Sequence, residues 1–246
     1  MKFGLADYGM NVWDGGCFDI EKRLADIRKI GYEGTERLEA NGAADALYKA
    51  ALYRKMGMDF ALCRGPDVQA TIQWTAALGK DYVWVQVGAT DFDAFCRQAR
   101  LQAEACARWS LKAGIHNHLG SLVESQKETE EFLRRCPECG LVFDTAHLAA
   151  AGGDCVEIAK KYANRVVALH LKDWLLTNPE AEQWHERGRF CELGAGNIGL
   201  DNAAVLRALV DAGFDGWVHV EQDTHLQDSL KDLAISRQYL RDAGFR

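Results

Sequence analysis

Hydrophobic and polar positions alternate regularly along the whole chain: short apolar runs are separated by longer stretches with the period of an amphipathic helix. The apolar runs have the length and flanking residues of buried strands, and they cover residues 2–7, 34–38, 59–63, 82–87, 112–116, 141–143, 166–171 and 217–221. Helix-period segments between them include residues 20–30, 67–78, 92–111, 127–136 and 203–212. The pattern predicts about eight strand–helix units.

This alternation predicts an α/β fold with a parallel sheet, either closed or open. No predicted strand is followed by the Gly-x-Gly-x-x-Gly turn of a dinucleotide-binding domain. Residues 31–39 (GYEGTERLE) and 213–221 (GFDGWVHVE) share one pattern near both chain ends, as expected for a barrel whose first and last strands meet. We therefore expect a (β/α)8 TIM barrel, and, since no linker interrupts the pattern, a single domain over residues 1–246.

Composition narrows the function classes. The net charge is -7, which argues against a nucleic-acid partner because such surfaces need clustered Lys and Arg. No apolar run has the length of a membrane span, and the chain does not open like a signal peptide, so we expect no membrane partner. The eight cysteines are scattered among apolar runs, including a lone CxxC at residues 136–139, and indicate reduced thiols in a cytoplasmic protein. A homo-oligomer is compatible with all of this.

The chemistry-bearing side chains follow the last four predicted strands, where barrel enzymes build their sites. These strand ends are residues 116–121 (HNHLGS), 144–147 (DTAH), 170–173 (HLKD) and 219–223 (HVEQD). One such residue alone is most often a helix cap or a hydrogen-bonded core residue, but four consecutive strand ends deliver them to one rim. Buried carboxylates need compensation, which a divalent cation provides. Mixed Asp, Glu and His ligands suit Mn, Mg, Co or Zn without choosing among them.

Several of these motifs resemble the xylose isomerase-like TIM-barrel family, and its sugar phosphate isomerase/epimerase branch is the nearest group. They are residues 143–147 (FDTAH), 170–173 (HLKD), 194–198 (GAGNI) and 213–217 (GFDGW), the last leading to Glu221. The HxHxGS run and the late EQD are more similar to inosose dehydratase and its relatives than to tagatose 3-epimerase. The resemblance implies a small sugar or polyol ketone as the substrate.

The resemblance also implies one divalent metal ion, which the family usually holds with Glu, Asp, His and Glu from strands five to eight. Asp144, His170 and Glu221 match the last three positions. The first position departs from the family, because the strand ends in His116. Either His116 is the fourth ligand, or Glu124 folds back from the following loop to replace it.

Around this metal the resemblance implies catalytic roles for Glu221, for His147, which matches the family's substrate-facing histidine, and for Lys172, which suits a substrate oxygen or an acid/base role.

Four further residues are candidates for substrate contact. His118 belongs to the fifth strand end, and Arg189 lies in a long loop of the kind that forms lids or clamps. Trp13 could stack on a sugar face or simply pack, and Glu36 could line the pocket or pair with Arg37.

The implied chemistry begins with a ketone and a neighbouring hydroxyl bound to the metal, which acidifies the alpha proton. A nearby base removes that proton, and isomerisation, epimerisation or dehydration follows. Histidine at position 116 weakens a symmetric two-carboxylate epimerase and favours a lyase or a one-base isomerase. Two alternatives stay open. One is an abasic-site endonuclease-like phosphodiesterase, which shares the barrel but needs more ligands and a basic DNA face. The other is a non-catalytic sugar-binding barrel.

Overall fold

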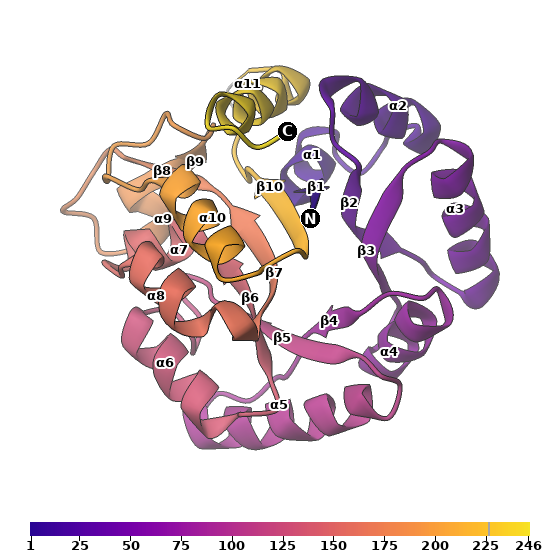
Figure 1. Cartoon of the computed structure of the whole chain (residues 1–246), viewed down its shortest axis with the longest axis horizontal. Helices are drawn as coiled ribbons and strands as arrows, with labels where there is room; N and C mark the ends of the chain where they lie inside the picture. The colour runs from indigo at the N-terminus through magenta and orange to yellow at the C-terminus, as the bar shows by residue number, and fades with distance from the viewer. Residues whose placement is uncertain (226) are drawn as a thin grey trace.

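Parallel strands form the wall of a barrel, and helices cover its outside (Figure 1). The computed structural model describes residues 1–225 and 227–246. The barrel strands are β1 (Lys2–Ala6), β2 (Gly34–Glu39), β3 (Asp59–Arg64), β4 (Tyr82–Trp84), β5 (Lys112–His116), β6 (Gly140–Asp144), β7 (Val166–Leu171) and β10 (Trp217–Glu221). Their order is β3-β2-β1-β10-β7-β6-β5-β4, with β3 and β4 at the two ends of the hydrogen-bonded sheet. The predicted single (β/α)8 barrel is confirmed as a nearly closed one.

The first and last barrel strands meet, as the internal repeat predicts. β1 pairs with β10 from Lys2 opposite Trp217 to Ala6 opposite Glu221. On the other side of β10, β7 aligns with it, and β6 aligns with β7 so that Asp144 lies opposite His170. Because all these strands run parallel, their carboxyl ends come together at one mouth of the barrel.

The outer helices begin and end at residues that the sequence pattern marks. They are α2 (Ile20–Ile30), α3 (Ala43–Lys55), α4 (Val68–Ala77), α5 (Phe92–Ala107), α6 (Gln126–Arg135), α8 (Cys155–Tyr162), α10 (Asn202–Asp211) and α11 (Ser229–Asp242). Side-chain oxygens of Asp67, Asp91 and Ser125 accept hydrogen bonds from backbone N–H groups in the first turns of α4, α5 and α6. A left-handed glycine, Gly31 with φ 108°, ends α2.

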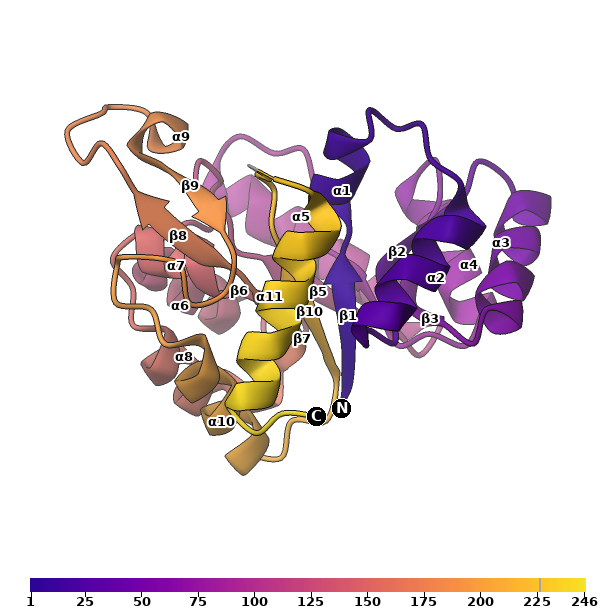
Figure 2. The same ribbon diagram turned by 90° about the horizontal axis from the view of Figure 1, so that it is seen from above.

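Additional elements lie at the carboxyl mouth of the barrel, which the strands point toward. They are the short helices α1 (Tyr8–Trp13), α7 (Thr145–Ala150) and α9 (Trp184–Arg187), and the antiparallel hairpin of β8 (Asp173–Leu176) and β9 (Gly188–Cys191). Figure 2 shows α1 and the hairpin at this end and both chain termini at the opposite end. The sequence pattern did not predict the hairpin. It also overextended the fourth strand, which ends at Trp84 rather than at residue 87.

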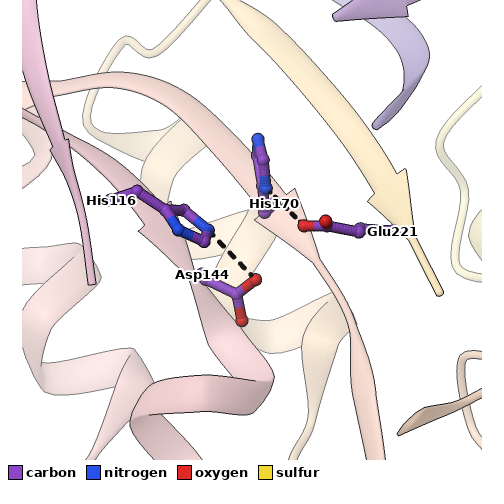
Figure 3. Close-up of side chains that lie close together, drawn as sticks. All are labelled: His116, Asp144, His170 and Glu221. Atoms are coloured by element: carbon purple, nitrogen blue, oxygen red, sulfur yellow. Dashed lines mark hydrogen bonds and ion pairs between the residues drawn. The ribbon is translucent and has the colours of Figure 1, made fainter. Parts of the chain in front are cut away.

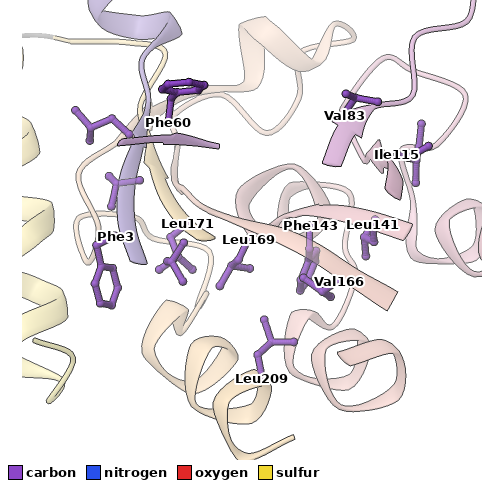
Figure 4. Close-up of a cluster of buried hydrophobic side chains, with 14 of the residues drawn as sticks. Phe3, Phe60, Val83, Ile115, Leu141, Phe143, Val166, Leu169, Leu171 and Leu209 are labelled. Carbon is purple, nitrogen blue, oxygen red and sulfur yellow. The ribbon is translucent and has the colours of Figure 1, made fainter. Parts of the chain in front are cut away.

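The hydrophobic core lies mainly between the barrel wall and the helices. Phe143, Leu169 and Leu171 are fully buried, and Leu209 of α10 packs in the same cluster (Figure 4). Outward apolar residues of this kind are what a parallel barrel needs to hold its helices. All eight cysteines are free thiols, and Cys17 is the exposed one. Within the described residues, no helix is long and apolar enough to cross a membrane.

Candidate metal centre

Four side chains from adjacent barrel strands converge at the carboxyl mouth (Figure 3). His116 ends β5, Asp144 ends β6, His170 lies near the end of β7, and Glu221 ends β10. One ligand atom from each lies within 4.8 Å of the others. Asp144 and His170 are fully buried, and Glu221 is 6% exposed. The structure therefore brings Asp144, His170 and Glu221 together, and their role as metal ligands stays a prediction.

The side chains of this centre already contact one another. Nδ1 of His170 lies 2.7 Å from Oε2 of Glu221, and Nε2 of His116 lies 3.5 Å from Oδ2 of Asp144. The ammonium of Lys172 lies 3.3 Å from the same Asp144 oxygen and 3.1 Å from the same Glu221 oxygen. The Lys172 ammonium thus partly balances the negative charge of the two carboxylates.

The donor set fits one divalent cation. Two imidazoles and two carboxylates are ligands that Mn, Co, Zn and related ions take in proteins. Nε2 of His116 and Oδ2 of Asp144 are buried without a hydrogen-bond partner among the described residues. Buried polar atoms of this kind cost free energy unless something engages them. A cation between them would engage both, so His116, Asp144, His170 and Glu221 are the residues that would hold it.

Glu36 is fully buried and contacts His170 on the side of the ring opposite Glu221. Its Oε1 accepts hydrogen bonds from Nε2 of His170 at 2.9 Å, from the Tyr82 hydroxyl at 2.9 Å and from Nε1 of Trp84 at 2.8 Å. A carboxylate behind a ligating histidine fixes the ring and its tautomer, so with a metal bound Nε2 would keep its proton toward Glu36 and Nδ1, beside Glu221, would be the ligand atom. We expected Glu36 to contact substrate, but these donors place it beneath His170 rather than on a cavity wall.

Charge coupling keeps these groups ionised. Burial by itself lowers the pKa of His170, but the Glu36 and Glu221 carboxylates outweigh it and raise the pKa to about 10. Burial raises the pKa of Glu221, yet Lys172 and His170 hold it well below its usual range. Asp144 follows the same rule, because Lys172 overcomes the burial that would raise its pKa.

Lys172 and His147 are buried beside the four clustered side chains. Burial lowers the pKa of Lys172, but Asp144, Glu221 and Asp223 raise it above its ordinary value, so the side chain stays an ammonium. Its Nζ lies 2.9 Å from Oδ2 of Asp223 and 3.3 Å from Nε2 of His147. Burial lowers the pKa of His147 to about 2, so this ring is neutral. Lys172 therefore reaches the two predicted catalytic groups, Glu221 and His147.

A cavity of about 440 Å³ opens directly above the centre, with Trp84, Trp184 and Phe190 among its aromatic walls. Trp174 and Phe190 of the β8–β9 hairpin pack edge to face at 4.9 Å. Gly188 makes this packing possible, because a Cβ there would lie 2.7 Å from the Trp174 ring. The hairpin therefore forms one side of a cavity large enough for a sugar-sized molecule.

Of the other three residues predicted to contact substrate, two line the cavity and one lies outside it. His118 and Arg189 line the cavity, and the His118 ring lies 3.8 Å from the His147 ring between centroids. Trp13, in α1, is 49% exposed and packs edge-on against His225 at 6.1 Å, outside this cavity.

The structure places the two candidates for the fourth ligand, His116 and Glu124, differently. His116 belongs to the cluster of ligand atoms. Glu124 lies in the following loop, where its Oε2 accepts a hydrogen bond from the Gly120 backbone N–H at 2.6 Å. Among the described residues, Glu124 is not one of the four clustered side chains, which favours His116 as the proposed fourth ligand.

Some contributors to the site were not recognised in the sequence. Tyr82 and Trp84 fix Glu36, and the Trp84 ring stacks on His116 with centroids 4.6 Å apart and planes 15° apart. Arg37 lines the cavity although it was considered only as a partner for Glu36. The available signal was a charged or polar residue inside an otherwise apolar strand.

Comparisons with known proteins agree with this architecture. Residues 67–243 match the family described as xylose isomerase-like TIM barrel. The chain is 26% identical over 293 residues to an inosose dehydratase of Lactiplantibacillus plantarum, covering 98% of this chain and 95% of that protein. It is 28% identical over 279 residues to the rhizopine catabolism protein MocC of Rhizobium meliloti, and the match covers 94% of this chain and 85% of that protein.

Among solved structures, the IolI protein with a bound zinc atom has the same fold. The TM-score is 0.70 at 16% identity, and the match covers 99% of this chain and 98% of that one. The match over residues 67–243 shows the family, and the barrel topology agrees with it: this chain belongs to the xylose isomerase-like TIM barrel family.

Proposed function

We propose that this chain is a divalent-metal-dependent enzyme that acts on a keto-sugar or keto-inositol by removing a proton alpha to the carbonyl. One observation carries the proposal: His116, Asp144, His170 and Glu221 converge at the floor of a cavity at the barrel mouth. The relatives named inosose dehydratase support an enzyme of the sugar isomerase, epimerase or dehydratase type. The free cysteines suit a reducing, cytoplasmic setting.

A divalent ion in this centre would supply Lewis-acid polarisation of the substrate ketone. Glu221 lines the cavity, and its Oε2 is engaged by His170 and Lys172. Its other carboxylate oxygen is the group that accepts the alpha proton. The Lys172 ammonium, held by Asp223, donates a hydrogen bond or a proton to a substrate oxygen as negative charge develops there.

The residues favour elimination or one-base isomerisation over epimerisation. Epimerisation needs proton donors and acceptors on both faces of the substrate, which a second carboxylate at the first ligand position would provide. Here that position holds His116, whose ring is fixed by stacking on Trp84. Lys172 and Glu221 lie together on one side, 3.1 Å apart, and can act on the departing hydroxyl and on the proton in sequence.

The test is proton exchange followed by NMR in D₂O. Protein loaded with Mn²⁺, Co²⁺ or Zn²⁺ is incubated with a panel of ketoses and inososes, and loss of the alpha-proton signal is measured. We expect metal-dependent exchange on at least one compound, with loss of water if the reaction is a dehydration. Glu221→Gln should abolish exchange and weaken metal binding, whereas Glu124→Gln in the nearby loop should keep both. Full exchange and full metal affinity in the Glu221 variant would contradict the proposal.

A further inference from the structure

Two arginines with unused hydrogen-bond donors face the cavity. Arg37 of β2 and Arg189 of β9 both line it, although they come from distant parts of the chain. The Nε atom of each is buried without a hydrogen-bond partner among the described residues. Within that part of the chain, neither guanidinium forms an ion pair with a carboxylate. A guanidinium removed from water and left without acceptors costs free energy.

Other partly buried arginines of this protein do have acceptors. Arg23 donates to the side chains of Asn11 and Asp14. Arg165 donates to backbone carbonyls at the end of α6, and Arg237 donates to the carbonyl oxygens of two separate loops. The Nε of Arg23 also lacks a partner, but its other guanidinium nitrogens donate hydrogen bonds, as do those of Arg165 and Arg237. Among the described residues, the guanidinium groups of Arg37 and Arg189 have no hydrogen-bond acceptor, and both line the cavity above the metal centre.

Each arginine has a neighbouring aromatic side chain that contacts a residue of the metal centre or its lysine. The Arg37 guanidinium lies 5.4 Å from the centre of the Trp84 ring, and that ring stacks on His116. Arg189 precedes Phe190, whose ring lies 4.3 Å from Nζ of Lys172. Because both side chains line the cavity above the metal centre, a molecule that fills this cavity can contact one or both guanidinium groups.

We infer that the substrate carries an anionic group, a carboxylate or a phosphate, and that Arg37 and Arg189 bind it. This inference rests on the proposed function, because it adds a charged substituent to the same hydroxyketone. The planar fork of a guanidinium matches both anions and binds them in a bidentate manner. The expected substrate is then a keto-sugar acid or a sugar phosphate rather than an uncharged inosose.

The experiment compares three ketoses with one carbon skeleton: D-fructose, D-fructuronate and D-fructose 6-phosphate. Binding to the metal-loaded protein is followed by tryptophan fluorescence, because Trp84, Trp174 and Trp184 line the cavity. We expect one anionic ketose to bind at least tenfold more tightly than fructose, and the better of the two identifies the anion. Inorganic phosphate, added alone, should compete if the phosphate form is preferred.

Variants connect the preference to the two side chains. Arg37→Met and Arg189→Met should each bring the affinity for the preferred anionic ketose close to that for fructose. Arg37→Lys keeps the charge without the fork and should recover part of the affinity, which distinguishes anion binding from misfolding. Arg54→Met, at an exposed position of α3, should keep the full preference.

Equal binding of the three ketoses would overturn the inference, and so would an anion preference that survives both methionine variants. These results are separable from a failure of the proposed function. Metal-dependent proton exchange on neutral ketoses without an anion preference would leave the proposed function standing and overturn this inference. Arginine-dependent anion binding without any proton exchange would support this inference and contradict the proposed chemistry.

Discussion

Replacing Glu36 with glutamine perturbs the metal centre without touching a proposed ligand. Glu36 accepts hydrogen bonds from His170, Tyr82 and Trp84 through one oxygen, and its side chain is fully buried. Glutamine has the same shape and can keep an acceptor at that place, but it removes the negative charge behind His170. The imidazole then becomes a poorer donor to the metal and loses part of its fixed orientation.

The expected loss of metal affinity can be estimated because Glu36 contacts the proposed ligand His170 and not the metal itself. Loss of such a partner typically costs 10- to 100-fold in metal affinity, or about 1.4 to 2.8 kcal/mol. At a metal concentration of about 100 times the native Kd, binding stabilises the folded protein by about 2.7 kcal/mol, and a 100-fold weaker site retains about 0.4 kcal/mol. For a chain of this length, the metal-induced rise in Tm would fall from about 5–11 °C to about 1–2 °C.

The assay measures Tm with and without metal for each protein, together with a Co²⁺ absorption titration in competition with a chelator. Comparing each protein with its own metal-free form removes any change in fold stability that the substitution causes. Glu39→Gln is the matched control, because Glu39 lies on the same strand and is exposed beside Arg64. Native metal affinity and an undiminished Tm rise in Glu36→Gln would refute the role assigned to Glu36.

Other substitutions test the ligand set, the pH dependence and the packing. His116→Glu should shift relative affinity from Zn²⁺ and Co²⁺ toward Mn²⁺ and Mg²⁺, because it replaces imidazole with carboxylate; unchanged ratios in competition titrations would exclude His116 as a ligand. Burial raises the pKa of Asp7 from 3.8 to about 6, so native stability should fall as pH rises through this range. Asp7→Asn should remove that step and stabilise the protein at pH 7 by roughly 1–3 kcal/mol in urea unfolding, and an unchanged pH profile would count against it. Gly9→Ala should destabilise by about 1–3 kcal/mol, because its Cβ would lie 1.8 Å from the Gln222 carbonyl oxygen. Gly42→Ala, with nothing within 4 Å, is its control in the same denaturation assay, and equal stability of the two variants would contradict the argument.

The barrel and most of its metal centre follow from local features of the sequence. The alternation of apolar runs with helix-period segments predicts the strand–helix units, since each unit buries its own apolar face. Asp144, His170 and Glu221 then fall at carboxyl ends of neighbouring parallel strands, so the topology alone brings them together. Nothing beyond strand direction and order is needed for these three.

Other parts of the site depend on contacts that no local pattern contains. Glu36 accepts a hydrogen bond from His170, which lies 134 residues away in the sequence. The curvature of the barrel wall brings these two side chains together. The preference for His116 over Glu124 depends on how one loop closes, through the bond from Gly120 to Glu124. The cavity likewise needs the β8–β9 hairpin, which brings Arg189 over the barrel mouth. Hydrophobic periodicity predicts which face of a helix or strand is buried. It does not predict which distant side chain packs against that face, and the contacts of Glu36, His116 and Arg189 depend on this.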